Sequence, residues 1–458
     1  MNPHAPRHAL LAIVALLAFD RSASAREGDL DPSFNGSGKL VFSIDPAAPI
    51  STAYAVAIDA GGRIVIAGSI SGPDPHEARW GVARLDDSGR FDPTFGSGGK
   101  VSIALGSVVE PAVPYAIAIQ TDGDIVLAGG AGADLAIARL DASGTLDPAF
   151  GTGGIWLANP GGGSTQPFIG GIALEPQPAG GQMIVFAGGS DSTNQQPNRF
   201  LRGYIDSTGQ FPHIDLLDPG PYDLNAFNAI VAEGTSFLMI GSSHDDVESA
   251  CSVRRYRLRY NGLGILQFFD DPAFAATDFV LGTGPGAECT LHAAAIPADG
   301  SIAIGGEQFN GDPTTDGAFV QGLDAGNGNT NGRLVIDAFA PDEGGVGSMR
   351  AVLAQADGKI VLAGYADTGA RLEFIVERRA WQPTSVARDP GFGDGGTSAI
   401  EFDEGDALSE SGALGAALDA KGRVVVVGFS YIDGSGTQSM AVARLEGDPI
   451  FRDGFDGS

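Results

Sequence analysis

The chain has 458 residues, with 27 basic and 56 acidic side chains and a formal net charge of −29 at pH 7. This length is ample for a large hydrophobic core, and a charged fraction of 18 % argues against intrinsic disorder. So negative a protein is repelled by nucleic acid and by anionic membranes, so we expect neither as a partner.

Residues 1–25 have the organisation of a secretory signal peptide. Arg7 precedes an apolar run from Ala9 to Phe19, and Ala23-Ser24-Ala25 then provides a small-residue cleavage site. A membrane anchor is the alternative, but a helix needs about 20 apolar residues to span a bilayer, more than this run offers. We therefore expect a soluble protein that is secreted, periplasmic or held at the cell surface.

An apolar run that ends in glycine organises the rest of the chain. In one copy, a strand-like segment at 115–119 and a tight turn at 121–123 precede the run 125–129, and another apolar segment follows at 135–140. Such regular recurrence is the signature of a repeat architecture. The run returns at intervals of 53 to 64 residues and predicts seven copies. Their terminal glycines are Gly68, Gly129, Gly188, Gly241, Gly305, Gly364 and Gly428.

Each copy predicts four strands. The first, as at 54–58, is apolar on both faces, and small residues such as Ala55 and Ala57 on one face would let neighbouring sheets converge on an axis. A tight turn such as Asp122-Gly123 leads to the second strand, the run that ends in glycine. A variable loop leads to the third strand, and a short turn leads to the fourth, as at 100–105. The third strands are expected at 80–85, 135–140, 200–205, 253–258, 319–323, 374–378 and 440–445.

The two ends of the chain are complementary. An isolated fourth strand at 39–43 opens the mature chain, whereas the last copy, which ends at 440–445, has no fourth strand of its own. If the leading strand completes the last sheet, no open edge remains. The sequence thus predicts an all-β fold, a seven-bladed β-propeller of four-stranded antiparallel blades over 26–448, with a C-terminal tail at 449–458. An open solenoid is the alternative, but it does not explain the complementary ends.

Three phrases carry a family resemblance: Leu-Asp-Pro-x-Phe-Gly-x-Gly-Gly-Lys-Val, Asp-Gly-x-Ile-Val-Leu-Ala-Gly and Ala-Arg-Leu-Asp-x-x-Gly. They resemble the delta-60 repeat of exported bacterial propeller-like proteins, almost throughout 91–151. The resemblance covers about 28–445, strongly in copies 1, 2 and 7 and loosely in copies 3 to 6. Copies 4 to 6 lack the Asp-Pro-x-Phe-Gly phrase at the expected place, so their turns are expected to differ. The resemblance implies export and a repeat scaffold, but it implies no single activity and no catalytic residues.

Charged residues recur at two positions of the repeat. Arginine recurs on the third strand, and aspartate recurs before a proline at the start of the fourth. Because an active site is rarely copied around a ring, we hypothesise charge-assisted hydrogen bonds that fix each connection. The alternative is an aspartate that only caps its own turn. The residues are Arg84, Arg139 and Arg444, with Asp31, Asp92 and Asp147.

Cys251 and Cys289 are the two cysteines of the chain. In an exported protein the pair is a candidate disulfide, which would contribute about 3–4 kcal/mol through the constraint on the unfolded chain. They fall in neighbouring repeats, near the starts of two strands. The sequence does not settle whether their geometry allows the bond.

No catalytic, cofactor-binding or metal-binding constellation stands out. The four histidines of the mature chain, His76, His213, His244 and His292, show no metal-ligand spacing, and His244-Asp245-Asp246 is more typical of a surface loop. The long loops are acidic but lack the calcium-loop pattern, so we expect no cofactor and keep Ca²⁺ only as a weak alternative. The acidic loop residues are Asp74, Glu77, Asp245, Asp246, Glu248, Asp312, Asp316, Asp342, Glu343, Glu404 and Asp406.

The long loops predict where a partner binds. In a propeller they lie on one face of the disc, beside the central channel, where loops vary freely on a rigid frame. We favour an exported, non-catalytic, monomeric scaffold that binds a polysaccharide, peptide or protein on that face. The alternatives are a hydrolase or lyase with its site at the channel mouth and a purely structural envelope component. Inward carboxylates with a histidine would favour the enzyme, and an aromatic-lined groove would favour glycan or peptide binding.

Overall fold

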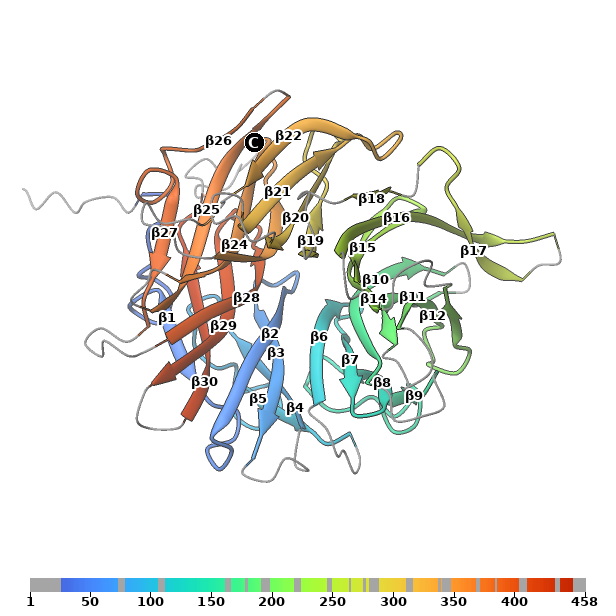
Figure 1. The fold of residues 1–458 in the computed structure, drawn as a ribbon. Coiled ribbons are helices and arrows are strands. Elements are labelled where there is room, and N and C mark those ends of the chain that lie inside the picture. The colour runs from blue at the N-terminus through green and yellow to red at the C-terminus, as the bar shows by residue number, and fades with distance from the viewer. Residues whose placement is uncertain are drawn as a thin grey trace, which may run out of the picture.

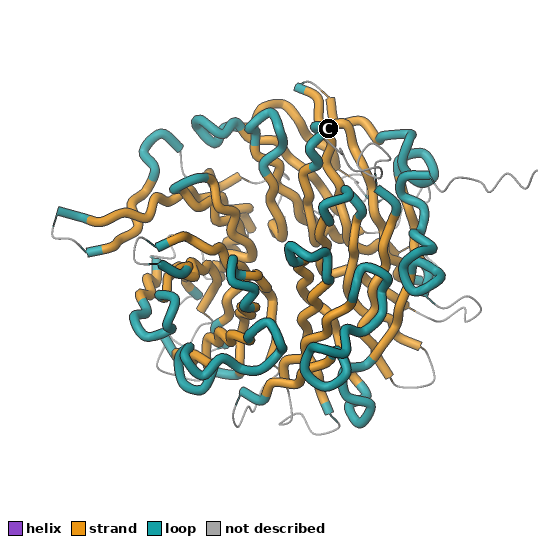
Figure 2. The backbone as a smooth tube through the Cα atoms, turned by 180° about the vertical axis from the view of Figure 1, so that it is seen from behind, coloured by secondary structure: helices purple, strands orange, loops and turns teal. Residues whose placement is uncertain are grey.

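The computed structural model describes most of the chain after the predicted signal peptide, and the segments it describes are strands joined by loops (Figure 2). The described residues are 26–72, 79–105, 112–160, 166–177, 180–190, 198–217, 224–244, 249–262, 265–274, 277–279, 288–309, 316–336, 339, 347–367, 371–383, 385–402, 410–432 and 437–447. The predicted signal peptide and the tail at 449–458 lie outside these ranges.

Consecutive strands pair antiparallel in sets of four (Figure 1). The first three sets are β2 (Ile50–Ile58), β3 (Ile64–Ser71), β4 (Arg79–Leu85) and β5 (Lys100–Ile103); β6 (Ala112–Ile119), β7 (Ile125–Ala131), β8 (Asp134–Leu140) and β9 (Ile155–Ala158); and β10 (Phe168–Pro176), β11 (Gln182–Ser190), β12 (Arg199–Ile205) and β13 (His213–Leu216).

The second half of the chain continues the pattern. The next three sets are β14 (Leu224–Glu233), β15 (Ser236–His244), β16 (Ser249–Tyr260) and β17 (Leu266–Asp270); β19 (Glu288–Ala295), β20 (Ile302–Phe309), β21 (Gly317–Leu323) and β22 (Thr330–Ile336); and β23 (Gly347–Ala354), β24 (Lys359–Asp367), β25 (Leu372–Gln382) and β26 (Ser385–Arg388). Two short strands are added to them, β18 (Thr277–Phe279) on β16 and β27 (Thr397–Ile400) on β25.

The last set joins the two ends of the chain. It contains β28 (Glu410–Leu418), β29 (Val424–Ile432) and β30 (Thr437–Leu445), and β1 (Lys39–Phe42) pairs antiparallel with β30. Lys39 lies opposite Ala443 and Phe42 lies opposite Met440, which is the pairing predicted from the sequence. The first strands of successive sets lie side by side, and β28 lies beside β2 (Figure 1).

The hydrophobic core lies between neighbouring sheets. One cluster, for example, joins Val65, Trp80 and Phe95 of the first set to Leu127 and Leu140 of the second. Small residues on two first strands allow a close approach at the centre, because a Cβ on Gly170 would meet the backbone of Phe227 and a Cβ on Gly415 would meet the carbonyl of Tyr54. Each set therefore depends on both neighbours for burial.

Each first strand carries a β-bulge at the same place. In β2 the pairing with β3 shifts between Ala53 and Ala55, so Tyr54 has no partner in the ladder. Gly68 pairs with Ala53, and a Cβ on Gly68 would overlap the carbonyl oxygen of Thr52. The bulge thus requires glycine on the second strand, which explains the glycine that recurs in the sequence. The bulged residues are Tyr54, Tyr115, Gly170, Asn228, His292, Arg350 and Leu414.

The fifth set corrects one prediction. The glycine beside its bulge is Gly306, which pairs with Leu291, and not Gly305. A Cβ on Gly306 would overlap the backbone carbonyl of Thr290, whereas a Cβ on Gly305 would meet the side chain of Met349. Because two glycines are adjacent here, the sequence left the register uncertain by one residue.

A buried arginine on the third strand joins each of five connections to the next set. Arg84 donates from Nε to Oδ2 of Asp92 at 2.9 Å and from Nη1 to the carbonyl of Ala142 in the second set at 2.5 Å. Its guanidinium carbon lies 4.5 Å from the centroid of the Phe95 ring. The charge-assisted hydrogen bonds predicted from the sequence are therefore present. The equivalent pairs are Arg139–Asp147, Arg255–Asp271, Arg378–Asp389 and Arg444–Asp31.

The fourth and sixth sets correct a second prediction, because their turns contain the Asp-Pro-x-Phe phrase after all. It lies at 271–274 after β17 and at 389–392 after β26. In both sets the third strand is long and pairs with two strands: its C-terminal part pairs with β17 or β26, and its N-terminal part pairs with the added strand, β18 or β27. The hairpin that β17 or β26 forms with the third strand moves the phrase further along the sequence, but its aspartate still contacts the arginine of the third strand. A search at a fixed spacing in the sequence therefore misses the phrase.

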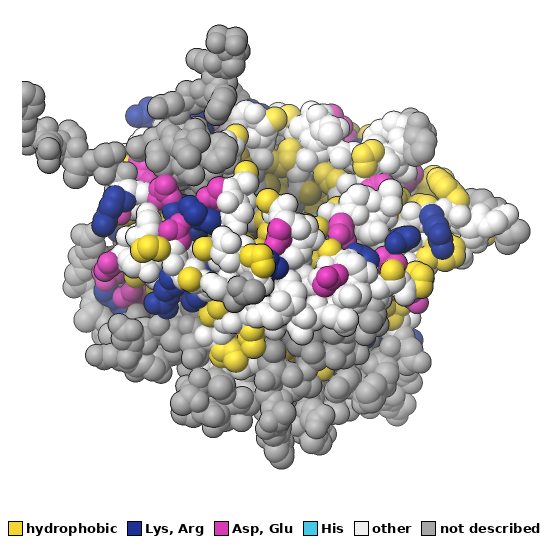
Figure 3. Space-filling model, turned by 90° about the horizontal axis from the view of Figure 1, so that it is seen from above, with side chains coloured by type: hydrophobic (Ala, Val, Ile, Leu, Met, Phe, Trp, Pro, Cys, Tyr) yellow, Lys and Arg dark blue, Asp and Glu magenta, His cyan; other side chains and the backbone are white. Residues whose placement is uncertain are grey.

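Side chains of both charges are interspersed on the surface. Seen from above relative to Figure 1, Lys and Arg side chains lie beside Asp and Glu side chains (Figure 3). Examples of exposed or half-buried pairs are Arg79–Asp45 and Lys421–Asp87. The excess of acidic residues in the chain does not prevent local basic positions.

Candidate functional site: the central channel

A cavity of about 510 Å³, called the central channel below, lies where the first strands of the described sets face one another. All seven bulged residues line it, and the residue that follows each bulge, also in the lining, is alanine or glycine. A bulge re-aims a side chain out of the regular alternation of a strand. The channel therefore takes its chemistry mainly from seven positions, one on each first strand.

One wall of the channel is aromatic. Tyr54 on β2 and Tyr115 on β6 meet edge to face with ring centroids 5.6 Å apart, and Tyr115 meets Phe168 on β10 at 5.5 Å. Burial raises the pKa of both tyrosines above the ordinary value of 10, so their phenols are neutral at physiological pH. Tyr115 is nevertheless 42 % exposed, which leaves aromatic surface available to a ligand.

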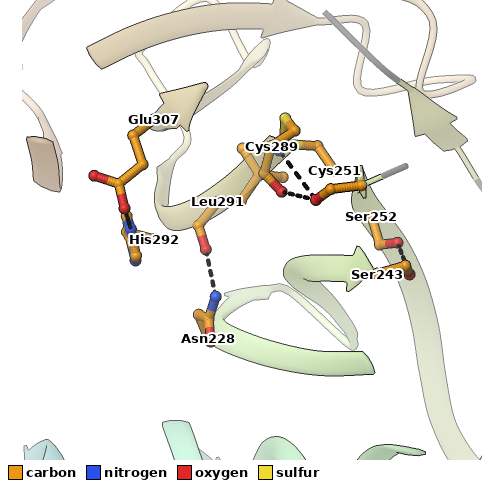
Figure 4. Close-up of a disulfide and its surroundings, with 9 residues drawn as sticks. Asn228, Ser243, Cys251, Ser252, Cys289, Leu291, His292 and Glu307 are labelled. Carbon is orange, nitrogen blue, oxygen red and sulfur yellow. Dashed lines mark hydrogen bonds and ion pairs between the residues drawn. A yellow bond between two sulfur atoms is a disulfide. The ribbon is translucent and has the colours of Figure 1, made fainter. Parts of the chain in front are cut away.

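The opposite wall is charged and polar. His292 on β19 lies 3.1 Å from Oε1 of Glu307 on β20, measured from Nε2, and the two side chains point toward one another (Figure 4). Arg350 on β23 places Nη1 at 3.3 Å from Nδ1 of His292 and donates from Nη2 to the hydroxyl of Tyr365 on β24 at 3.0 Å. Asn228 on β14 completes this wall, where it donates to the carbonyl of Leu291 at 2.8 Å (Figure 4).

These contacts determine the charges of the cluster. Burial lowers the pKa of His292 below 6.5 and the nearby positive charge of Arg350 lowers it further, against the hydrogen bond to Glu307. Burial alone would raise the pKa of Glu307, but the hydrogen bond and charge of His292 and the charge of Arg350 lower it to about 2. At neutral pH the cluster thus contains a carboxylate, a guanidinium and a neutral imidazole. Since an ionised carboxylate only accepts, the imidazole donates from Nε2 to Glu307.

A second cavity of about 300 Å³ adjoins the aromatic wall, and Tyr115 and Phe168 line both cavities. Its lining includes the start of β14 and the end of β11, so it lies on the face where the second strands end and the first strands begin. Side chains with amides, Gln166, Asn198 and Asn225, are part of that lining. Together the two cavities offer an aromatic edge with hydrogen-bonding groups on each side.

The structure brings only one of the sequence-predicted candidates into the channel. His292 lies there, whereas His213 is on the outer strand β13 with Nε2 at 2.9 Å from Asp215. His76 lies outside the described residues, as does the Asp245-Asp246 part of the His244 cluster. Most acidic loop residues lie outside them too, and Asp316 is the exception. Among the described residues, no group of three His, Cys, Asp or Glu side chains is placed to hold a metal ion.

Sequence reasoning missed Glu307, Arg350 and Tyr365 as members of a site. A usable signal existed, because in five of the seven sets the bulged residue stands fourteen positions before the glycine that pairs beside it, as Tyr54 does before Gly68 and Arg350 before Gly364. Reading that position along the repeats would have found most of the channel residues.

Cys251 on β16 and Cys289 on β19 form a disulfide, with Cα atoms 5.2 Å apart (Figure 4). Both cysteines are buried, at 0 % and 1 % exposure. Ser249 on β16 also joins the two strands, since its hydroxyl Oγ accepts a hydrogen bond from the backbone amide of Cys289 at 3.0 Å. The disulfide joins the fourth set to the fifth. Cys289 lies three residues before His292, so the disulfide anchors the strand that presents this histidine.

Comparison with known proteins supports the propeller architecture and no particular activity. Residues 120–150 match the family model described as a domain of unknown function (DUF5122) beta-propeller. No curated protein sequence matches the chain. The match and the strand pairings define the chain as an all-β protein of the β-propeller class. The described part of the chain contains no helix of the length and apolarity that a membrane span requires.

Several solved structures are similar over most of their length. They include a catalytically inactive virginiamycin B lyase from Staphylococcus aureus with quinupristin (11 % identity, 88 % of this chain and 98 % of that chain, TM-score 0.43). Sqt1 from Chaetomium thermophilum has 13 % identity, covers 89 % of this chain and 100 % of that chain, and has a TM-score of 0.44. An α-L-arabinanase from Penicillium chrysogenum with arabinobiose has 9 % identity, covers 91 % of this chain and 96 % of that chain, and has a TM-score of 0.40. Because these TM-scores are below 0.5, we base no argument on them.

Proposed function

We propose that this chain is an exported, seven-bladed β-propeller that binds a short carbohydrate in its central channel. Seven four-strand sets, the contact of β28 with β2 and the pairing of β1 with β30 support a ring closed by the N-terminal strand. Export rests on the signal-peptide pattern at 1–25. The long loops of the same face lie largely outside the described residues, so the channel and its side cavity carry the proposal.

The observation that carries the function is the division of the channel into an aromatic wall and a polar wall. Tyr54, Tyr115 and Phe168 provide rings that can pack against the apolar CH faces of a sugar. Amides in the side cavity and the cluster around His292 provide donors and acceptors for its hydroxyl groups. This combination suits a polyhydroxylated ligand.

A glycan array tests the proposal. The full mature chain should bind a subset of short oligosaccharides, and Tyr115→Ala should weaken that binding about 3- to 10-fold, since aromatic packing contributes about 0.5–1.5 kcal/mol beyond buried area. Phe211→Ala is the matched control, because Phe211 is 74 % exposed and does not line the channel. Absence of any glycan binding, or equal loss in both variants, would remove the proposal.

A second candidate is an enzyme whose base is His292. The favouring observation is the Glu307–His292 pair, because a carboxylate that accepts from Nε2 orients the imidazole and stabilises the imidazolium formed when Nδ1, which Arg350 contacts in this structure, takes up a proton. The two candidate functions can be distinguished by incubating the glycans that bind with the wild-type protein and with His292→Ala and comparing the products. New reducing ends or unsaturated products that depend on His292 would establish the enzyme, and intact glycans would establish a binding protein.

A further inference from the structure

Arg350 has unused hydrogen-bonding capacity inside the channel. Its guanidinium carries five N–H donors, and the structure assigns contacts to Nη1 and Nη2 only, with His292 and Tyr365. The buried Nε has no hydrogen-bond partner. The side chain as a whole is 26 % exposed and lines the cavity, so a ligand can reach the guanidinium although Nε itself is covered. A buried donor without a partner is costly, and a planar guanidinium matches a carboxylate better than a hydroxyl.

The charges around His292 respond to such a ligand. The strands that pack against β19 are β14, β15, β16, β20 and β23. The charged groups among them that act on His292 are Glu307 of β20 and Arg350 of β23, and Asn228 of β14 is uncharged. Arg350 and Glu307 balance one another, with Nη2 at 3.8 Å from Oε1. A carboxylate that binds Arg350 would leave this group with a net negative charge next to a neutral imidazole.

We propose that Arg350 binds one carboxylate of the ligand, so that the channel selects a short oligosaccharide with a single uronate residue, and that His292 takes up a proton as the ligand binds. This inference rests on the proposed carbohydrate binding and adds the class of sugar. One carboxylate is specified because the net charge of −29 repels a polyanion, whereas a single charge within the channel is governed by its local partner.

The direction of the pH dependence follows from the charges. In the free protein the pKa of His292 is below 6.5 because of burial and Arg350. The ligand neutralises Arg350 and adds a negative charge nearby, so the pKa of His292 is higher in the complex than in the free protein. Binding therefore tightens as pH falls from 7.5 to 5.5, while the sugar carboxylate, with an ordinary carboxyl pKa near 4, stays ionised.

The experiment compares matched sugars by isothermal titration calorimetry on the full mature chain. The probes are disaccharides that end in glucuronate or galacturonate, each paired with the neutral glucose or galactose counterpart. We expect each preferred acidic disaccharide to bind about 10- to 100-fold more tightly than its neutral partner, a difference that Arg350→Gln removes. Arg259→Gln, on an exposed part of β16, is the control and should change nothing.

Proton uptake provides an independent readout. Titrations in two buffers of different ionisation enthalpy should show uptake of up to one proton at pH 6 in the wild type and none in His292→Gln, with His213→Gln as control. Near-ultraviolet circular dichroism of each variant reports whether the fold is kept. Equal affinity for acidic and neutral sugars, or an acid preference that survives Arg350→Gln, would overturn the inference while leaving carbohydrate binding intact. Failure of the wild type to bind any sugar, or sugar binding that Tyr115→Ala leaves unchanged, would instead refute the proposed function.

Discussion

Removal of the Arg84 guanidinium tests whether the repeated arginine holds neighbouring sheets together. Its side chain is 3 % exposed and serves Asp92 at 2.9 Å, the Ala142 carbonyl of the next set at 2.5 Å and the Thr94 hydroxyl at 3.2 Å. Breaking a buried ion pair costs about 3–5 kcal/mol, because one charge stays buried without its partner. Arg63 lies 3.8 Å from Asp92 and compensates in part, so we expect Arg84→Ala to cost about 3 kcal/mol.

The assay is urea unfolding followed by tryptophan fluorescence, because Trp80 is fully buried on the same strand. Arg84→Lys keeps the charge but cannot reach three acceptors in a fork, so it should recover only part of the loss. Arg90→Ala, which removes an exposed arginine, should change stability by less than about 0.5 kcal/mol. A loss below about 1 kcal/mol in Arg84→Ala, or full recovery by lysine, would show that the arginine does not link the sheets.

Three further outcomes follow from the fold. Replacement of Cys251 and Cys289 by serine should lower the free energy of unfolding by about 3–4 kcal/mol, given a sequence separation of 38, and a reductant should destabilise the wild type but not this variant. Gly306→Ala should lower the urea midpoint more than Gly305→Ala, because only the first overlaps backbone; equal losses would contradict the bulge register. The pKa of Asp92 lies below 3.8, since hydrogen bonds from Thr94 and the charge of Arg84 outweigh burial. The contribution of the Asp92 carboxylate to stability is therefore present above pH 4 and is lost as pH falls through the pKa of Asp92 in the folded protein. Asp92→Asn should be less stable than the wild type at pH 7 but should lose less stability between pH 5 and 3, which circular dichroism can measure.

The sequence by itself determined the repeating elements and the pairing of the ends. The runs that end in glycine, the Asp-Gly turns and the arginine–aspartate pairs act over short stretches of chain, so their physical causes are visible in one copy and confirmed by the others. The strand at 39–43 without a sheet and the last copy without a fourth strand predicted the contact of β1 with β30. Where insertions changed the spacing, as before Asp271 and Asp389, the same reasoning failed although the residues were present.

Only the tertiary structure decided what lines the channel. His292 and Arg350 line the cavity and contact Glu307 and Tyr365 beside it, and these four residues come from four strands. The bulge position in the repeat marks the first two, but nothing in the local sequence distinguishes Glu307 and Tyr365 from other polar residues. His292 and Arg350 meet because the first strands face one another across the cavity and because a bulge at one position re-aims one side chain of each strand, whereas Glu307 and Tyr365 reach them from the paired second strands. Local chemistry determines the conformations that recur, so they can be deduced from a repeat. The chemistry of the cavity depends on single residues that differ from one set to the next, and these residues come close only when the sheets are assembled.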